Sequence, residues 1–286
     1  MNRPEKEVDR KDCVYRYFDK VTQQWNDIYE AESLEALHLR IRKERVLGLI
    51  DNIGFSSGSK ALDLGCGAGL TTLALLQKGF RVEAFDISDN MLGVAKRNCL
   101  DAGFSKEVSF VQGDAEHLRF PPEHFDLAVS MGLFGYVPNW GNVIKGLGAA
   151  IKPGGYLVVT FQSKYGLSHL VNPRSLRLGT IRNFFLRQPA RSKVPQEDRF
   201  SGSEFKRVLK DNLLQVVSDS TFGFGPFVPL GQKILPETSN LRLYLALQRR
   251  ADAGSIPFLA QMGKTHVLVA RKSSGMGCAD DSASAT

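Results

Sequence analysis

Apolar residues recur every three to four positions through the first 55 residues, which is the period of an amphipathic helix. One helical stretch extends to Tyr29, and a second begins after Ser33, a residue type that favours the N-cap position. Six residues of the second stretch are expected to point inward: Leu34, Leu37, Ile41, Val46, Ile50 and Ile53. Gly54 and the small residues at 56–59 then break the pattern. The pattern predicts an N-terminal helical cap over residues 1–55.

Short apolar runs then alternate with helical stretches. Five strands are expected, at 60–64, 81–86, 108–111, 125–130 and 156–161. Three helices are expected between them, at 70–78, 89–102 and 140–151. Gly79 can end the first of these helices, and Ser88 can cap the second. Strands that alternate with helices form βαβ units around a parallel sheet, so the sequence predicts an α/β fold.

The alternation ends after Phe161, where a basic insertion over residues 164–213 begins. Three more elements are expected at or beyond its end: strands at 214–222 and 266–271, and a helix at 239–252. The last residues are small and polar, as in a disordered tail. We therefore expect three parts: a helical cap at 1–55, a main domain at 56–272 and a disordered tail at 273–286.

The composition is that of an ordinary globular protein, with 43% hydrophobic and 23% charged residues. No apolar run is long enough to predict a membrane-spanning helix, and the charged start of the chain does not resemble a signal peptide. The four cysteines have no paired spacing, so they fit a reducing compartment better than disulfides or a zinc knuckle. These features predict a cytoplasmic protein.

The net charge of +7 is concentrated in one segment. Residues 164–211 hold eleven Lys and Arg against four Asp and Glu. Such a surplus is compatible with a solvated basic face, and it would also attract an anionic substrate, a membrane surface or nucleic acid. The charge alone leaves these four interpretations open.

The first strand ends in a glycine-rich turn, Asp63-Leu64-Gly65-Cys66-Gly67-Ala68-Gly69. Glycines at this place let the backbone turn sharply and let a ligand approach closely. The dinucleotide pattern G-x-G-x-x-G is not met, because Leu70 stands where the third glycine belongs. Asp63 would also repel a pyrophosphate but attract an ammonium group. The turn therefore predicts a site for an adenosine that carries an amino acid.

Polar residues follow the next strands, at the sheet edge where open α/β folds bind ligands. Asp86 stands about 20 residues after the glycines and can accept both ribose hydroxyls. Asp114 can accept a hydrogen bond from an adenine amino group, and the Ala115 amide can serve a ring nitrogen. Met91 can supply an apolar face for adenine. The backbone carbonyls of Ser130 and Met131 can face a sulfonium and an ammonium group.

Several blocks, in this order, resemble the class I S-adenosylmethionine-dependent methyltransferases. They are residues 61–69, 85–88, 91–92, 113–116, 125–130 and 147–155. The resemblance covers residues 35–162, and the run from Gly113 to Phe125 is similar to small-molecule methyltransferases of the ubiquinone and menaquinone type. It implies a Rossmann-like, doubly wound, seven-stranded sheet with an antiparallel last strand. The residue pattern adds the N-terminal helical cap and a helical insertion after strand five.

The resemblance implies S-adenosylmethionine as the cofactor. The expected cofactor-binding residues are Asp63, Gly65, Cys66, Gly67, Gly69, Asp86, Ile87, Met91, Asp114, Ala115, Ser130 and Met131. It implies no catalytic residue, because many relatives have His or Glu after the fourth strand, where this chain has Leu133-Phe134-Gly135-Tyr136. Tyr136 and His169 are candidates for substrate contact. No cluster of His, Asp and Glu has the spacing of a metal site.

The expected reaction is methyl transfer to a small-molecule acceptor, by O-methylation of an amphipathic or anionic metabolite. The insertion interleaves arginines with leucines and phenylalanines, which suits such an acceptor or a membrane surface. C- or N-methylation of a quinone or lipid-like molecule is an alternative. The basic charge favours an RNA methyltransferase, but no RNA-binding module is recognisable. An inactive adenosyl-binding protein and a dehydrogenase are the remaining classes.

Overall fold

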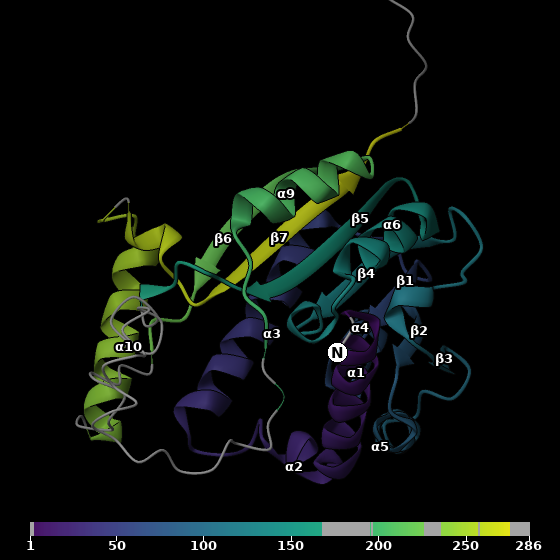
Figure 1. Cartoon of the computed structure of the whole chain (residues 1–286), viewed down its shortest axis with the longest axis horizontal. Helices are drawn as coiled ribbons and strands as arrows, with labels where there is room; N and C mark the ends of the chain where they lie inside the picture. Colours follow the sequence, from purple (N-terminus) through teal and green to yellow (C-terminus); the bar gives the residue numbers. More distant parts are fainter. Residues whose placement is uncertain (1–2, 168–194, 196, 226–235, 257, 275–286) are drawn as a thin grey trace, which may run out of the picture.

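The chain folds around one seven-stranded sheet with helices on both faces (Figure 1). The computed structural model describes residues 3–167, 195, 197–225, 236–256 and 258–274. The strands are β1 (Lys60–Leu64), β2 (Arg81–Asp86), β3 (Val108–Gln112), β4 (Phe125–Met131), β5 (Ile151–Gln162), β6 (Leu214–Phe222) and β7 (Thr265–Lys272). Their order across the sheet is β3-β2-β1-β4-β5-β7-β6.

The sheet has the predicted doubly wound topology. Strands β1 to β5 pair in parallel, and β7 lies antiparallel between β5 and β6. Tyr156 of β5 stands opposite Arg271 of β7, and Gln162 stands opposite Thr265. The predicted seven-stranded sheet with an antiparallel last strand is therefore confirmed.

The helices also follow the predicted pattern. They are α1 (Arg3–Lys20), α2 (Thr22–Asp27), α3 (Leu34–Ile53), α4 (Leu70–Gln77), α5 (Asp89–Asp101), α6 (Trp140–Ala150), α9 (Gly202–Asp211) and α10 (Glu237–Asp252), with short 3₁₀ turns η1 (Ala115–His117), η2 (Phe134–Tyr136) and η4 (Leu259–Gln261). The Ser33 hydroxyl caps α3 by accepting from the Ala36 amide, and Ser88 caps α5 by accepting from the Met91 amide.

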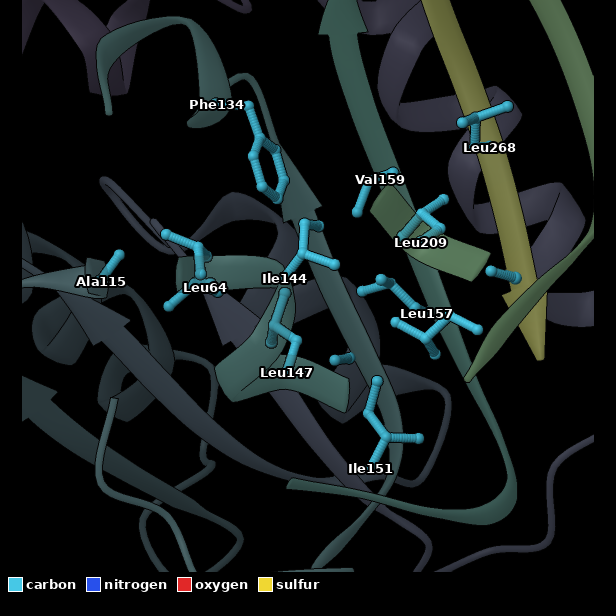
Figure 2. Close-up of a cluster of buried hydrophobic side chains, with 14 of the residues drawn as sticks. Leu64, Ala115, Phe134, Ile144, Leu147, Ile151, Leu157, Val159, Leu209 and Leu268 are labelled. Carbon is cyan, nitrogen blue, oxygen red and sulfur yellow. The ribbon is translucent and has the colours of Figure 1, made fainter. Parts of the chain in front are cut away.

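Two hydrophobic clusters lie on opposite faces of the sheet, because successive strand residues point to opposite sides. Leu62 and Leu64 of β1 pack into the cluster that α6 and α9 cover, while Ala61 belongs to the cluster under α3 and α4. Figure 2 shows the first cluster, where Ile144 and Leu147 of α6 lie among strand residues. Burial on both faces leaves the carboxyl edge of the sheet as the place for polar chemistry.

The inward face of α3 differs from the prediction. Val46 and Ile50 are buried as expected, but the other four predicted residues are only partly buried. His38 and Arg42 are buried in their place. The helix packs on the sheet near its end and borders a cavity near its start, so its buried stripe includes polar residues there.

Strand β5 begins at Ile151, earlier than the predicted residue 156, because Ile151 pairs with Phe125 ahead of a shift in register. The predicted insertion at 164–213 is only partly described: residues 168–194 and 196 lie outside the described residues, and its described part contains α9. The predicted tail lies almost wholly outside them, so its disorder and the domain limits stay predictions. No described helix has the length and apolar character needed to cross a bilayer.

Candidate active site

The sheet reverses its winding between the neighbouring strands β1 and β4, and a cavity of about 480 Å³ opens at their carboxyl ends. Residues of the loops after β1, β2 and β4 line it, together with residues of α1, α2 and α3. A smaller cavity of about 60 Å³ lies toward β3 and shares Gly65, Asp86 and Tyr136 with the first. Crevices at such reversal points are the usual ligand sites of open α/β sheets.

The glycine-rich turn forms one wall of the cavity. The amides of Gly65 and Cys66 both donate to the Phe85 carbonyl, at 2.8 and 3.1 Å, which ties the turn to the end of β2. Gly67 has a φ of +53°, and no atom lies within 4 Å of where a Cβ would stand. Its backbone is therefore open to a ligand.

Asp63 lies at the bottom of the cavity with only 2% of its surface exposed. The Thr72 hydroxyl donates a hydrogen bond to its Oδ2 at 2.6 Å. Burial raises the pKa of Asp63 to about 7, and the charge of Asp86 acts in the same direction. A cation bound beside this carboxylate would stabilise its ionised form.

Asp86 links the ends of two strands. Its Oδ2 accepts from the Gly67 amide at 2.9 Å, and its Oδ1 accepts from the Ser88 amide at 3.0 Å. Burial raises its pKa although both bonds act against this. Each carboxylate oxygen has a second lone pair, so Asp86 can still accept hydrogen bonds from a ligand.

Asp114 and Ala115 line the smaller cavity, as does Lys11 of α1. The Lys11 ammonium donates to Asp114 at 2.9 Å and to Glu116 at 2.7 Å. Partial burial alone would raise the pKa of Asp114, but the bond from Lys11 brings it below the usual value. An adenine amino group would have to share this carboxylate with Lys11.

Four of the other predicted cofactor residues line the main cavity: Cys66, Ile87, Met91 and Met131. Burial raises the pKa of the Cys66 thiol.

Gly69 and Ser130 line neither of the two cavities found in the described part of the chain. Gly69 lets α4 approach α5, because a Cβ there would stand 2.7 Å from the Ala95 Cβ. The Ser130 hydroxyl donates to the Leu64 carbonyl at 3.0 Å and is fully buried. Their contact with a cofactor therefore stays a prediction.

Of the two candidates for substrate contact, Tyr136 lines both cavities. Burial raises its pKa, as does the charge of Glu197, so the phenol is held in its protonated form. His169 lies outside the described residues. In the part of the chain that the structure describes, no three His, Cys, Asp or Glu are placed to hold a metal ion.

The structure adds polar residues that the sequence did not indicate: Arg42, Gln162, Glu197 and Lys264 all line the main cavity. The Arg42 Nε and the Gln162 Oε1 are buried and form no hydrogen bond within the described residues. Arg42 lies against the backbone at Gly132, where a Cβ would stand 2.6 Å from the guanidinium. No local pattern marks these residues, since each comes from a different element.

The N-terminal helices cover the cavity. Phe18, Trp25 and Tyr29 line it, and the ring of Phe18 meets that of Tyr136 edge-on at 5.1 Å. Asp19 at the end of α1 accepts hydrogen bonds from the Ser88 hydroxyl at 3.0 Å and the Asn90 amide at 2.8 Å. The helical cap is thus tied to the start of α5, beside Asp86.

Residues 61–155 match a family model described as a methyltransferase domain, and this range contains the glycine-rich turn, Asp86 and Asp114. The matched range is a class I S-adenosylmethionine-dependent methyltransferase domain. S-adenosylmethionine is the cofactor of such domains. The resemblance stated from the sequence blocks is therefore confirmed.

Curated relatives of this methyltransferase domain include the ubiquinone biosynthesis O-methyltransferase of Burkholderia orbicola (strain MC0-3). It is 32% identical over 111 residues, which is 39% of this chain and 47% of that protein. The enzyme of the same name from Aeromonas salmonicida (strain A449) is 28% identical over 144 residues, 50% of this chain and 58% of that protein. The chain thus spans about half the length of these relatives.

Among solved structures, magnesium protoporphyrin IX methyltransferase from Synechocystis PCC 6803, with bound SAH, is similar in fold. Its TM-score is 0.62 at 17% identity, and the similarity covers 92% of this chain and 100% of that one. At this level of identity, the match supports the Rossmann-like methyltransferase fold and says nothing further about this chain's acceptor.

Proposed function

We propose that the chain transfers the methyl group of S-adenosylmethionine to an oxygen atom of a small amphipathic or anionic metabolite. The observation that carries this proposal is a single cavity that joins the cofactor residues of the methyltransferase domain to polar residues outside it. Asp63 and Asp86 lie in its cofactor half, and Glu197 and Lys264 line it from elements far along the chain.

Residues of the two cavities can be assigned to the polar groups of S-adenosylmethionine. Asp63 would hold the ammonium group, Asp86 the ribose hydroxyls, and Asp114 with Ala115 the adenine. Arg42 would hold the carboxylate, because its buried Nε lacks a partner within the described residues and an unpaired buried donor is costly. Every charged group of the cofactor's amino acid then has an opposite charge beside it.

The bound cofactor supplies an electrophilic methyl group and a neutral leaving group. The chain's own contribution is alignment and exclusion of water. Phe18 of α1, Trp25 of α2 and Tyr29 in the turn after α2 line the cavity on the N-terminal side. Aromatic faces and backbone carbonyls, such as that of Met131, can stabilise a sulfonium.

A small acceptor is favoured over RNA for two reasons. Helices α1, α2 and α3 line the cavity, and its volume of about 480 Å³ suits a small-molecule ligand. The curated relatives reported above are named for O-methylation in ubiquinone biosynthesis. N- or C-methylation, RNA methylation and loss of activity are the alternative outcomes of the test below.

Calorimetry with S-adenosylmethionine, S-adenosylhomocysteine and NAD tests the first half of the proposal. We expect micromolar binding of both adenosyl ligands, loss of binding in Asp86→Ala, and no change in Asp101→Ala, an exposed residue at the end of α5. Binding of NAD alone, or of none of the three, contradicts the proposal. A labelled-methyl screen of metabolite and lipid extracts beside RNA then identifies the acceptor class.

A further inference from the structure

The loop after β4 carries no acid or histidine, yet a carboxylate lies against it. Glu197 reaches this loop from the insertion, about 60 residues further along the chain. Its side chain occupies the space over Gly135, where a Cβ would collide with the Glu197 Cγ and stand 3.0 Å from the Asp198 carbonyl. The Asp198 amide donates to the Gly135 carbonyl at 2.7 Å, which fixes the segment in this place.

Glu197 lines the main cavity, in the part that we call its acceptor end because it lies outside the cofactor half. Tyr136, Gln162 and Lys264 line the same cavity, and so does Arg42 from α3. The Gln162 Oε1 is a buried acceptor without a hydrogen-bond partner among the described residues. This end of the cavity therefore holds the Glu197 carboxylate, the Lys264 amino group and the unpartnered Gln162 Oε1, which come from three separate segments.

We propose that Glu197 is the proton acceptor of the methyl-transfer reaction and that the acceptor molecule presents a hydroxyl group between Glu197 and Lys264. The assignment rests on the proposed function. The hydroxyl proton passes to the Glu197 carboxylate while an oxygen lone pair forms the new O–C bond. The C–S bond of the cofactor breaks, and its electron pair stays on sulfur as a neutral thioether.

The neighbouring charges favour a hydroxyl over an amine. Three cations face this position, Arg42, Arg199 and Lys264, against two carboxylates, Glu197 and Glu35. Their net positive charge would repel an ammonium group. The Lys264 ammonium would instead stabilise the negative charge that develops on an oxygen as its proton leaves. Tyr136 is unsuitable as the base, because burial and the Glu197 charge keep its phenol protonated.

The pH dependence follows from the groups that face Glu197. These are Lys264 before β7, Arg42 on α3, Arg199 in the same segment and the neutral Tyr136 on η2. Burial raises the pKa of Glu197, and the three cations together with a hydrogen bond to the Gln162 side chain only partly oppose this. We expect kcat to fall as the pH drops through this raised pKa, since a protonated carboxyl cannot accept a proton.

The test uses the full chain, S-adenosylmethionine labelled in its methyl group, and three probes: catechol, 3,4-dihydroxybenzoate and benzylamine. We expect the wild type to methylate at least one hydroxyl probe and to leave benzylamine unchanged. Glu197→Gln should lower kcat by about a hundredfold or more, remove the acid limb of the kcat profile and leave KM and cofactor affinity nearly unchanged. Glu197→Asp should restore part of the rate.

Glu204→Gln is the matched control, because it removes an exposed carboxylate in the first turn of α9 that lines neither of the two cavities. Its kcat should stay near that of the wild type. The assignment is overturned if Glu197→Gln keeps its kcat, or if protein with normal cofactor affinity methylates benzylamine alone or no probe. A wild type that does not bind S-adenosylmethionine would contradict the proposed function itself, so the two failures are distinguishable.

Discussion

The Thr72 hydroxyl donates a hydrogen bond to the buried Asp63 carboxylate at 2.6 Å, which joins the first turn of α4 to the end of β1. This bond favours ionised Asp63, but burial and the nearby Asp86 charge outweigh it and raise the pKa of Asp63 to about 7. Asp63 therefore changes its charge close to neutral pH, before any cofactor is bound.

Cofactor affinity should depend on pH through Asp63. The ammonium group of S-adenosylmethionine needs the ionised carboxylate, so protein that carries a proton on Asp63 must first lose it. With a pKa of about 7, affinity should be about fivefold weaker at pH 6 than at pH 7. Calorimetry at both values measures this. Thr72→Val should move the transition to higher pH, and a flat wild-type profile would contradict the assignment of Asp63.

The same carboxyl should lower the stability of the ligand-free protein above neutral pH. Its folded pKa of about 7 lies above the value of about 3.9 in an unfolded chain. The stability given by the neutral form is therefore fully present below about pH 4 and is lost as the pH rises to and through about 7. Asp63→Asn should therefore raise the free energy of unfolding above that of the wild type. This gain should be on the order of 2 kcal/mol larger at pH 8 than at pH 5. Urea unfolding at both values checks this, with Asp101→Asn as the control that should show no such gain.

Most of the fold could be predicted because its signals are local. The run Lys60–Leu64 is apolar and ends in glycines, and Ser88 precedes the first turn of α5, so neighbouring residues alone specify these elements. The start of β5 could not be predicted in this way. Its residues at 152–155 look like a helix end followed by a turn, and only the pairing of Ile151 with Phe125 extends the strand through them.

The candidate site likewise contains residues that local patterns predict and residues that depend on long-range contacts. Asp63, Gly67 and Asp86 lie at the strand ends where the motif places them, and all three border the main cavity. Glu197 and Lys264 gave no signal, because their positions depend on contacts between segments far apart in the chain. The apolar pattern of α3 does not include Arg42, and its burial depends on how α3 meets the loop at Gly132.

Gly69 should be intolerant of a side chain although it lines no described cavity. Its φ is +81°, and a Cβ would stand 2.7 Å from the Ala95 Cβ and 2.9 Å from the Ala95 Cα. Gly69→Ala should therefore lower the free energy of unfolding by about 1–3 kcal/mol. Gly93→Ala in α5 is the matched control, because nothing lies within 4 Å of its Cβ position. It should be neutral or slightly stabilising, and equal losses in both variants would contradict this explanation.

Helix α1 should control how fast the cofactor leaves. Lys11 ties this helix to Asp114 and Glu116 at 2.9 and 2.7 Å, and its next turns bring Val14 and Phe18 over the main cavity. Lys11→Met removes both ion pairs while keeping much of the side-chain volume. The helix should then open more often, and dissociation of S-adenosylmethionine in stopped-flow displacement should become several-fold faster.

The matched control for this experiment is Arg16→Met on the same helix. Arg16 pairs with Asp12, and its side chain is 75% exposed. Such surface ion pairs contribute little to stability. The cofactor dissociation rate of Arg16→Met should equal that of the wild type.

Lys11→Met also frees Asp114 to accept more fully from adenine, which would slow dissociation if that bond outweighed the loss of cover. A charge-assisted pair contributes more than a bond from a neutral amine, so we expect the loss of cover to dominate. Equal rates in the two variants would show that α1 does not retain the cofactor.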